Sequence, residues 1–297
     1  MRCISKTKSI RMVLRLGVGL MMSLFVLGIS NIQYVEGSSW HKGRFHKAES
    51  LSCGEMITTH AVLYDDLDCS NVDGVSITLG EGASLDLNGQ KVIGNSNENC
   101  IEITGDGAEV RNGTVTHCDY GIRVRSNLNK ITNVKVSDCA SRGFRIDGDE
   151  NLLKKCVATQ NANQGIVIKG NDNKIFSCEV RDNCRDGIEI DKGTEGNLVY
   201  YNDVENNGNL QTCEHFGLGG DNYKPWNYAG IDVVSPSQNN EIKHNRACGN
   251  RGCFGTDDSP CTAYERNFWD ENSLNQWDFN SITCRNVKPK FNGFSPH

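Results

Sequence analysis

The feature that most constrains this chain is an internal repeat of 22 residues. A Gly-Ile-x-Ile-like segment recurs with its glycines 22 residues apart, at Gly121, Gly143, Gly165 and Gly187. Related segments at 100–103 and 230–233 extend the series in both directions. A fixed period of this length predicts a solenoid, in which each repeat forms one coil that stacks on the next.

Each repeat has room for three short strands and the turns between them. The Gly-Ile-x-Ile segment alternates apolar and polar residues, which indicates a first strand with one buried face. An asparagine marks the turn into a second strand at Asn129, Asn151, Asn173, Asn197 and Asn240. A third strand is marked by Val115, Val136, Ala158, Val180, Val204 and Ala247. Because a strand-helix-strand unit needs about 30 residues, the repeat predicts an all-β, single-stranded right-handed parallel β-helix with three parallel sheets.

These repeats resemble those of the pectin-lyase-like superfamily over residues 75–252. The segments at 53–69, 85–89 and 267–270 are similar to the NosD-type subgroup of β-helix proteins. The resemblance implies a substrate groove walled by the first sheet and the neighbouring turns. It fixes no activity, because the same repeat serves lyases, hydrolases, epimerases and adhesins. The catalytic segments typical of polygalacturonases, pectate lyases and mannuronan epimerases do not occur in this sequence.

The flanking segments define the expected domain organisation. Five basic residues precede an uncharged apolar run at 16–29, which predicts a secretory signal peptide over 1–37, with a retained N-terminal anchor as the alternative. Residues 38–74 are expected to cap the β-helix at its N-terminal end. Residues 253–297, which are rich in Cys and Trp, are expected to cap the other end.

The charge balance and the cysteines indicate an extracellular protein. Removing residues 1–37 takes away five of the 31 basic and one of the 37 acidic residues, which leaves a net charge of −10. Such a chain repels nucleic acid and anionic membranes, so we expect neither as a partner, and we expect a monomer. Thirteen of the 14 cysteines remain without repeated metal-binding spacing, which favours disulfides in a secreted protein.

Two disulfides are predicted directly. We expect Cys53 to join Cys69 across the N-terminal cap, and Cys184, which lies in the turn column, to join Cys213 and tie the inserted loop to the preceding turn. Two further cysteines, Cys156 and Cys178, align on adjacent coils as either a stacked apolar pair or a disulfide. If they are bonded, and if Cys118 pairs with Cys139 and four C-terminal cysteines pair among themselves, then Cys100 is the odd thiol.

The repeat is interrupted once, at residues 208–228, where about twenty extra residues separate two first strands. The segment contains neither repeat motif, so we interpret it as an inserted loop, with an additional coil as the alternative. Inserted loops on rigid scaffolds often carry function. In this loop we expect His215 or Lys224 to serve as a base, and Tyr223 and Trp226 to bind a sugar.

Carboxylates converge on the first sheet if the segment is a loop. Glu189 and Asp232 then lie on neighbouring coils about 5 Å apart at the backbone, with Asp191 on the same face. Carboxylates this close must share a proton or a cation. A shared proton suits glycoside hydrolysis, and a Ca²⁺ ion, the one cofactor that we consider, would bind to the same three oxygen-bearing side chains.

Arginines lie on the same face toward the N-terminus. Arg123 and Arg145 are expected to bind the carboxylates of an acidic substrate, with a solvated ladder of ion pairs as the alternative reading. The sequence therefore predicts a secreted β-helix that binds or cleaves an acidic polysaccharide, as a lyase, hydrolase or epimerase. The rival hypothesis is a non-catalytic structural or adhesive protein of the cell exterior.

Overall fold

The structure is a computed structural model that describes residues 51–218, 228–254, 262–265, 267–271 and 274–282. The chain divides into two units, residues 1–49 and 50–297, and the fold described here is that of the second unit. The predicted signal peptide lies outside the described residues.

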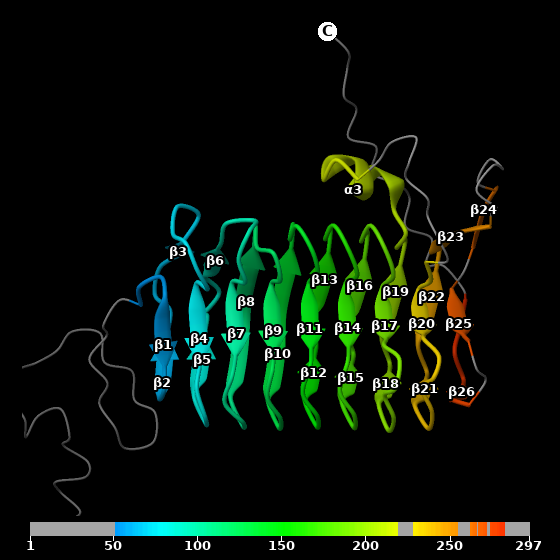
Figure 1. Ribbon diagram of the computed structural model, residues 1–297, viewed down its shortest axis with the longest axis horizontal. Helices are drawn as coiled ribbons and strands as arrows, with labels where there is room; N and C mark the ends of the chain where they lie inside the picture. The colour runs from blue at the N-terminus through cyan, green and yellow to red at the C-terminus, as the bar shows by residue number, and fades with distance from the viewer. Residues whose placement is uncertain (1–50, 219–227, 255–261, 266, 272–273, 283–297) are drawn as a thin grey trace, which may run out of the picture. The chain divides into compact units, whose positions relative to one another are not determined.

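The first strands of the coils form one nine-stranded parallel sheet, seen as a row of stacked arrows in Figure 1. Its members, in spatial order, are β1 (Glu55–Ile57), β4 (Ile77–Leu79), β7 (Ile101–Ile103), β9 (Ile122–Val124), β11 (Phe144–Ile146), β14 (Ile166–Ile168), β17 (Ile188–Ile190), β20 (Ile231–Val233) and β25 (Phe268–Asp270).

The second and third strands together form a fifteen-stranded sheet. Its members are β2 (His60–Val62), β3 (Leu67–Asp68), β5 (Ser84–Asp86), β6 (Lys91–Ile93), β8 (Glu109–Thr116), β10 (Lys130–Ser137), β12 (Leu152–Lys154), β13 (Val157–Thr159), β15 (Lys174–Phe176), β16 (Glu179–Arg181), β18 (Leu198–Tyr200), β19 (Asp203–Glu205), β21 (Glu241–Lys243), β22 (Arg246–Cys248) and β26 (Gln276–Asp278).

The prediction of three separate sheets is therefore corrected to two. All three columns of strands are present, but β8 and β10 run through both the second and the third position. Within them the chain bends at Asn112 and Asn133, whose φ angles are 60° and 57°. Asparagine tolerates this left-handed conformation better than most residues, so the bend is made without ending the strand.

The remaining elements lie outside the repeat. The helix α3 (Leu210–His215) lies in the insertion, and β23 (Arg251–Phe254) pairs with β24 (Thr262–Glu265) in an antiparallel hairpin. The side chain of Asn209 caps α3 by accepting hydrogen bonds from the backbone nitrogens of Gln211 and Thr212. Residues 118–204 contain no helix, as the strict repeat predicts.

The core is built from stacked apolar columns. Ile122, Phe144, Ile166, Ile188 and Ile231 are register partners along the first sheet and are fully buried. This confirms the predicted inward column. Stacked coils bury these side chains on both sides, which an isolated coil could not do, so each repeat depends on its neighbours for stability.

Buried asparagines connect the turns of successive coils. Asn183 is typical, since its Oδ1 accepts hydrogen bonds from the backbone N and the Nδ2 of Asn161 at 3.1 and 2.8 Å. Its Nδ2 in turn donates to the oxygen of Ala158 and to Oδ1 of Asn207. The same pattern continues through Asn250 to Asn267. The ladder supplies partners for turn amides that have no place in the sheets.

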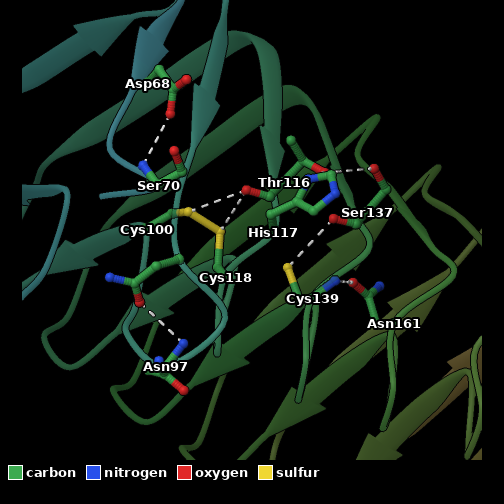
Figure 2. Close-up of a disulfide and its surroundings, with 11 residues drawn as sticks. Asp68, Ser70, Asn97, Cys100, Thr116, His117, Cys118, Ser137, Cys139 and Asn161 are labelled. Atoms are coloured by element: carbon green, nitrogen blue, oxygen red, sulfur yellow. Dashed lines mark hydrogen bonds between the residues drawn. A yellow bond between two sulfur atoms is a disulfide. The ribbon is translucent and has the colours of Figure 1, made fainter. Parts of the chain in front are cut away.

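The glycine column exists because these asparagines fill the space beside it. A Cβ atom added to Gly187 would lie 2.7 Å from Nδ2 of Asn207 and 2.4 Å from Cγ1 of Val204. In an earlier coil, Cys100 takes the glycine position and Cys118 takes the asparagine position. The two side chains point at each other and form a disulfide, shown in Figure 2.

Three disulfides lie among the described residues. The pairs Cys53–Cys69 and Cys184–Cys213 are confirmed. The bond between Cys100 and Cys118 corrects the expectation that Cys118 pairs with Cys139 and that Cys100 stays free. Cys139 is a buried free thiol whose backbone nitrogen donates to Asn161, the first asparagine of the ladder (Figure 2).

The other aligned cysteines, Cys156 and Cys178, are also free and buried. Each thiol donates to backbone carbonyls beside it, at distances between 3.5 and 3.9 Å. Of the two alternatives, the stacked pair is therefore the one observed. Cys248 is disulfide-bonded as well.

The β-helix also runs past residue 252, where the repeat pattern weakens. β25 pairs with β20 and β26 with β21, so both sheets gain one more coil. At the other end, β1 to β3 pair with the strands of the following coil. The expected caps therefore contribute strands to the two sheets.

We expect Asn183→Ala to lower the free energy of unfolding by about 2–4 kcal/mol, because it leaves several buried groups without hydrogen-bond partners. Asn71→Ala, at an exposed asparagine, serves as the control and should change stability by less than about 0.5 kcal/mol. Chemical denaturation of both variants measures the difference. Equal stabilities would show that the ladder contributes nothing.

Gly187→Ala tests the close packing beside the ladder. The added methyl group overlaps Val204, Asn207 and the carbonyl of Gly230, so we expect a loss of about 1–3 kcal/mol or more. In Gly80→Ala the nearest atoms lie 3.6 Å away, and stability should be almost unchanged. Thermal melts of the two variants check this prediction, which a melting temperature for Gly187→Ala equal to that of wild type would contradict.

Candidate functional site

The insertion leaves the stack of coils intact. β17 pairs directly with β20, and Glu189 and Asp232 are register partners. No coil therefore lies between them, as the loop interpretation requires. The two carboxylate-bearing residues are neighbours on the outward face of the first sheet.

Both ends of the insertion are fixed to the turn that precedes β17. Near its start, the Cys184–Cys213 disulfide and a 2.7 Å hydrogen bond from the Thr212 hydroxyl to the carbonyl of Asp182 hold α3. At its end, the backbone nitrogen of Ala229 donates to Oδ1 of Asp186 at 2.6 Å. These contacts with the turn hold the insertion beside β17, the strand that carries Glu189.

The acidic part of the sheet is shielded from water. Asp186 and Asp232 expose only 3% and 8% of their surface, and Glu189 is half-buried. The outward residue of the preceding coil, Val167, is fully buried. In β7, β9 and β11, by contrast, the outward residue keeps partial exposure. We call Asp186, Glu189 and Asp232 the carboxyl cluster.

Burial and mutual repulsion shift the acidity of this cluster. Burial, reinforced by the charges of Asp232 and Glu189, raises the pKa of Asp186 well above its ordinary value. Burial and the charge of Asp191 raise the pKa of Glu189, against an opposing hydrogen bond from Gln164. The pKa of Tyr228, at the end of the insertion, is raised by burial and by Asp186 against the opposing charge of Arg185. Both shifts favour the protonated form of the Asp186 and Glu189 carboxyl groups.

Asp191 lies near the cluster but has its own partners. Lys169 forms an ion pair with its carboxylate, and the backbone nitrogen of Lys192 donates to Oδ1 at 2.8 Å. Its charge is therefore largely balanced, and it acts on Glu189 from a distance. Of the three carboxylates predicted to act together, the structure brings Glu189 and Asp232 together and pairs Asp191 elsewhere.

A basic cluster occupies the same sheet on the N-terminal side. The Nε atoms of Arg123 and Arg145 both donate to Asp147, at 2.9 and 2.7 Å. Together with Arg142, these guanidinium groups lie 5.5–5.7 Å from the ring centre of Tyr120. The Nε of Arg142 is buried and has no hydrogen-bond partner among the described residues. The cluster keeps donors that an anionic ligand could use.

The remaining predicted residues belong to the insertion. His215 is exposed and lines a hollow of about 420 Å³ with Asp138, Gln160 and Asp182, residues of the turns that follow the third strands. The structure therefore places it on the ridge of these turns. Tyr223, Lys224 and Trp226 lie outside the described residues.

Among the residues that directly precede the glycine column, the sequence analysis gave no role to Tyr120 and Gln164. Tyr120, Arg142, Gln164 and Asp186 occupy this position in successive coils. They line the edge of the first sheet beside the outward column, and Gln164 and Asp186 are almost fully buried. Their 22-residue spacing was a usable signal, but their burial follows only from the packed structure.

Two absences concern only the described part of the chain. There, no three His, Cys, Asp or Glu side chains are arranged to hold a metal ion. Within the same residues, no helix has the length and apolar character needed to cross a membrane.

Solved structures share this architecture at low sequence identity. Tailspike protein 2 of bacteriophage CBA120, in its enzymatically active domain, matches with a TM-score of 0.51 and 10% identity over 77% of this chain and 38% of that chain. The mannuronan C-5 epimerase AlgE6 A-module of Azotobacter vinelandii gives 0.41 and 11% over 77% and 80%. An alginate lyase from Paenibacillus sp. str. FPU-7 gives 0.39 and 14% over 62% and 81%. At these identities, the likeness concerns the fold alone.

The family comparison is more direct. No curated protein sequence matches the chain significantly. The family described as "Right handed beta helix region" matches residues 57–207 and 99–288, which together span most of the chain and contain both sheets. The NosD-type subgroup stays a prediction. From its repeat, its two parallel sheets and this match, the chain belongs to the right-handed β-helix family.

Proposed function

We propose that this chain is a secreted, monomeric β-helix protein that binds an acidic polysaccharide along its first sheet and acts on it with the carboxyl cluster. The observation that carries the proposal is the direct pairing of Glu189 with Asp232 beside the buried Asp186. These groups lie where the insertion rejoins the coil. A rigid sheet next to a functional loop is a common setting for a binding site.

The charge distribution supports an acidic substrate. Along the first sheet, the basic cluster is followed by the carboxyl cluster, with Val167 and Gln164 between them. The guanidinium groups of Arg123, Arg142 and Arg145 gather around the ring of Tyr120, and their positive charge favours a carboxylate of the glycan. A sugar further along the same glycan chain would then lie over β17 and β20, which are two and three coils away from β11, at about 4.8 Å per coil.

The carboxyl cluster supports proton transfer. A neutral carboxyl group can donate to a glycosidic oxygen while an ionised neighbour accepts a proton or stabilises positive charge. In a lyase or epimerase, one member of the pair would remove the proton from the carbon beside a neutralised uronate carboxylate. The other would protonate the leaving glycosidic oxygen as a double bond forms, in a lyase, or return a proton to the opposite face of the same carbon, in an epimerase. From the insertion, Tyr223 and Trp226 are proposed to bind the sugar, and Lys224 or His215 to assist as a base.

Calcium remains part of the proposal as an alternative to the shared proton. The oxygens of Glu189, Asp191 and Asp232 are of the kind that Ca²⁺ prefers. However, Asp191 is already paired with Lys169, and the described residues form no metal-holding set. We therefore derive no catalytic step through Ca²⁺ and include the ion as an arm of the assay.

The test incubates the protein with pectate, alginate and chondroitin, each with and without Ca²⁺. Unsaturated-uronate absorbance detects a lyase, new reducing ends detect a hydrolase, and NMR of the recovered polymer detects an epimerase. We expect one of these signals together with binding. Silence on every substrate, with no glycan binding, would instead support a structural or adhesive role, which the ion pairs of Arg123 and Arg145 with Asp147 also fit.

Glu189→Gln and Asp232→Asn should each lower glycan turnover by about 100-fold or more, because each removes one member of the acid-base pair. The matched control is Glu179→Gln, at an exposed glutamate of β16 on the other sheet, and it should keep full turnover. Initial rates at saturating glycan measure the effect. Wild-type rates in both cluster variants would exclude the cluster from the chemistry.

Asp186→Asn should stabilise the protein at neutral pH. The pKa of this carboxyl is raised on folding, so the folded state holds the proton more tightly and stability falls as pH rises above the ordinary value near 3.8. The amide keeps an oxygen for Ala229 and carries no charge. We expect Asp186→Asn to be more stable than wild type at pH 8, and this difference should vanish below pH about 4.

Thermal melts between pH 4 and pH 8 measure this difference, with Asp73→Asn, at an exposed aspartate, as a surface control. A variant that is less stable than wild type at pH 8 would mean that the Asp186 charge is compensated in the fold.

A further inference from the structure

Gln164 lies directly against Glu189 and carries an incomplete set of hydrogen bonds. Its Nε2 donates to Oε2 of Glu189 at 2.5 Å. The side chain is 5% exposed, and its Oε1 is buried without a hydrogen-bond partner among the described residues. A buried amide oxygen without a partner is unfavourable. The oxygen gains a partner if the amide group can also adopt a second orientation.

The backbone of Gln164 is held firmly while its amide is not. Its carbonyl accepts a hydrogen bond from the backbone nitrogen of Gly143, and the next residue, Gly165, packs against Asn183. The terminal amide, by contrast, has one partner, Glu189. Rotation about the last side-chain bond exchanges the nitrogen and the oxygen with almost no change in shape.

The carboxyl group of Glu189 needs different partners in its two protonation states. When ionised, it accepts hydrogen bonds only, and the Nε2 of Gln164 supplies one. When protonated, it gains an O–H donor, and the Oε1 of Gln164 becomes the matching acceptor once the amide has turned. One glutamine can therefore satisfy both states from the same position.

We propose that Gln164 is a positioning residue that holds the Glu189 carboxyl in place in both of its protonation states by turning its amide between donor and acceptor. The proposal deepens the proposed function, because it explains how a buried acid can lose and regain a proton without moving. It does not require that glycan be turned over.

Several other charged groups lie near Glu189. Asp191 lies on the same strand, and Arg142 and Lys169 come from the two preceding coils. Asp186 enters from the turn before β17 and Asp232 from β20. None of them is altered in the experiments below.

The first experiment uses the wild-type protein and follows the side-chain resonances of Gln164 by NMR as pH is varied. The proposal expects both the amide nitrogen and the amide carbon of Gln164 to shift with the same midpoint as the Glu189 carboxyl carbon. Below the midpoint the carbonyl should show an accepted hydrogen bond, and above it the amide protons a donated one. Resonances of Gln164 that do not follow the Glu189 titration would overturn the proposal.

The second experiment replaces the amide with Gln164→Met, which keeps the length of the side chain and removes both donor and acceptor. Because both states of Glu189 lose a partner, its midpoint should stay within about half a pH unit. The melting temperature should fall on both sides of that midpoint.

The matched control is Gln238→Met, since Gln238 forms a similar but exposed amide-to-carboxylate pair with Glu195, and it should leave Glu189 and the melting temperature unchanged. A clear rise of the Glu189 midpoint in Gln164→Met, with stability lost only above it, would show a fixed donor and contradict the turning amide. Unchanged stability at every pH would remove any role for Gln164. A protein inactive on all glycans would end the proposed function and leave these outcomes unaffected.

Discussion

The structure depends on the hydrogen bonding between identical positions of successive coils. In each turn, the backbone amides cannot join the sheets, and burial without partners would be unfavourable. Asparagine solves this problem because it carries both a donor and an acceptor on a short side chain. Asn161, Asn183 and Asn207 each bond to the next asparagine and to a backbone carbonyl or amide. The repeat follows from this requirement, because each coil must return an asparagine to the same position. Coils of different length still meet it, since Asn183 and Asn207 are 24 residues apart and remain bonded.

The same constraint explains the glycines and the disulfide at Cys100. The asparagine side chain occupies the volume into which a Cβ on the adjacent first-strand position would project. Glycine is required where the ladder is present. Where the ladder is absent, Cys100 and Cys118 fill the two facing positions and bond covalently. One steric relation thus accounts for the regular glycine spacing in the later coils and for a covalent bond in an earlier one.

The candidate site arises where the regular coil is interrupted. The insertion starts at a turn tethered through Cys184 and returns through Ala229, whose amide bonds to Asp186. Glu189 and Asp232, 43 positions apart in the sequence, thereby become register partners. Asp186 and Asp232 are buried there, and burial raises the pKa of the Asp186 carboxyl well above its ordinary value. The basic residues of the same sheet keep their ion pairs with Asp147, so the two ends of the face differ in charge and in hydration.

The sequence by itself determined the class of fold, the inward Ile column, the pairing of Cys53 with Cys69 and the tether from Cys184 to Cys213. The fold class, the inward column and the Cys184 tether follow from a period, because a period fixes which residues stack. The tertiary structure decided that the second and third strands share one sheet, that Cys100 bonds to Cys118, and that Asp191 pairs with Lys169. It also showed that Asp186 and Gln164 are buried beside Glu189. Such features depend on the direction of side chains across a coil and on exclusion of water, and a linear spacing encodes neither.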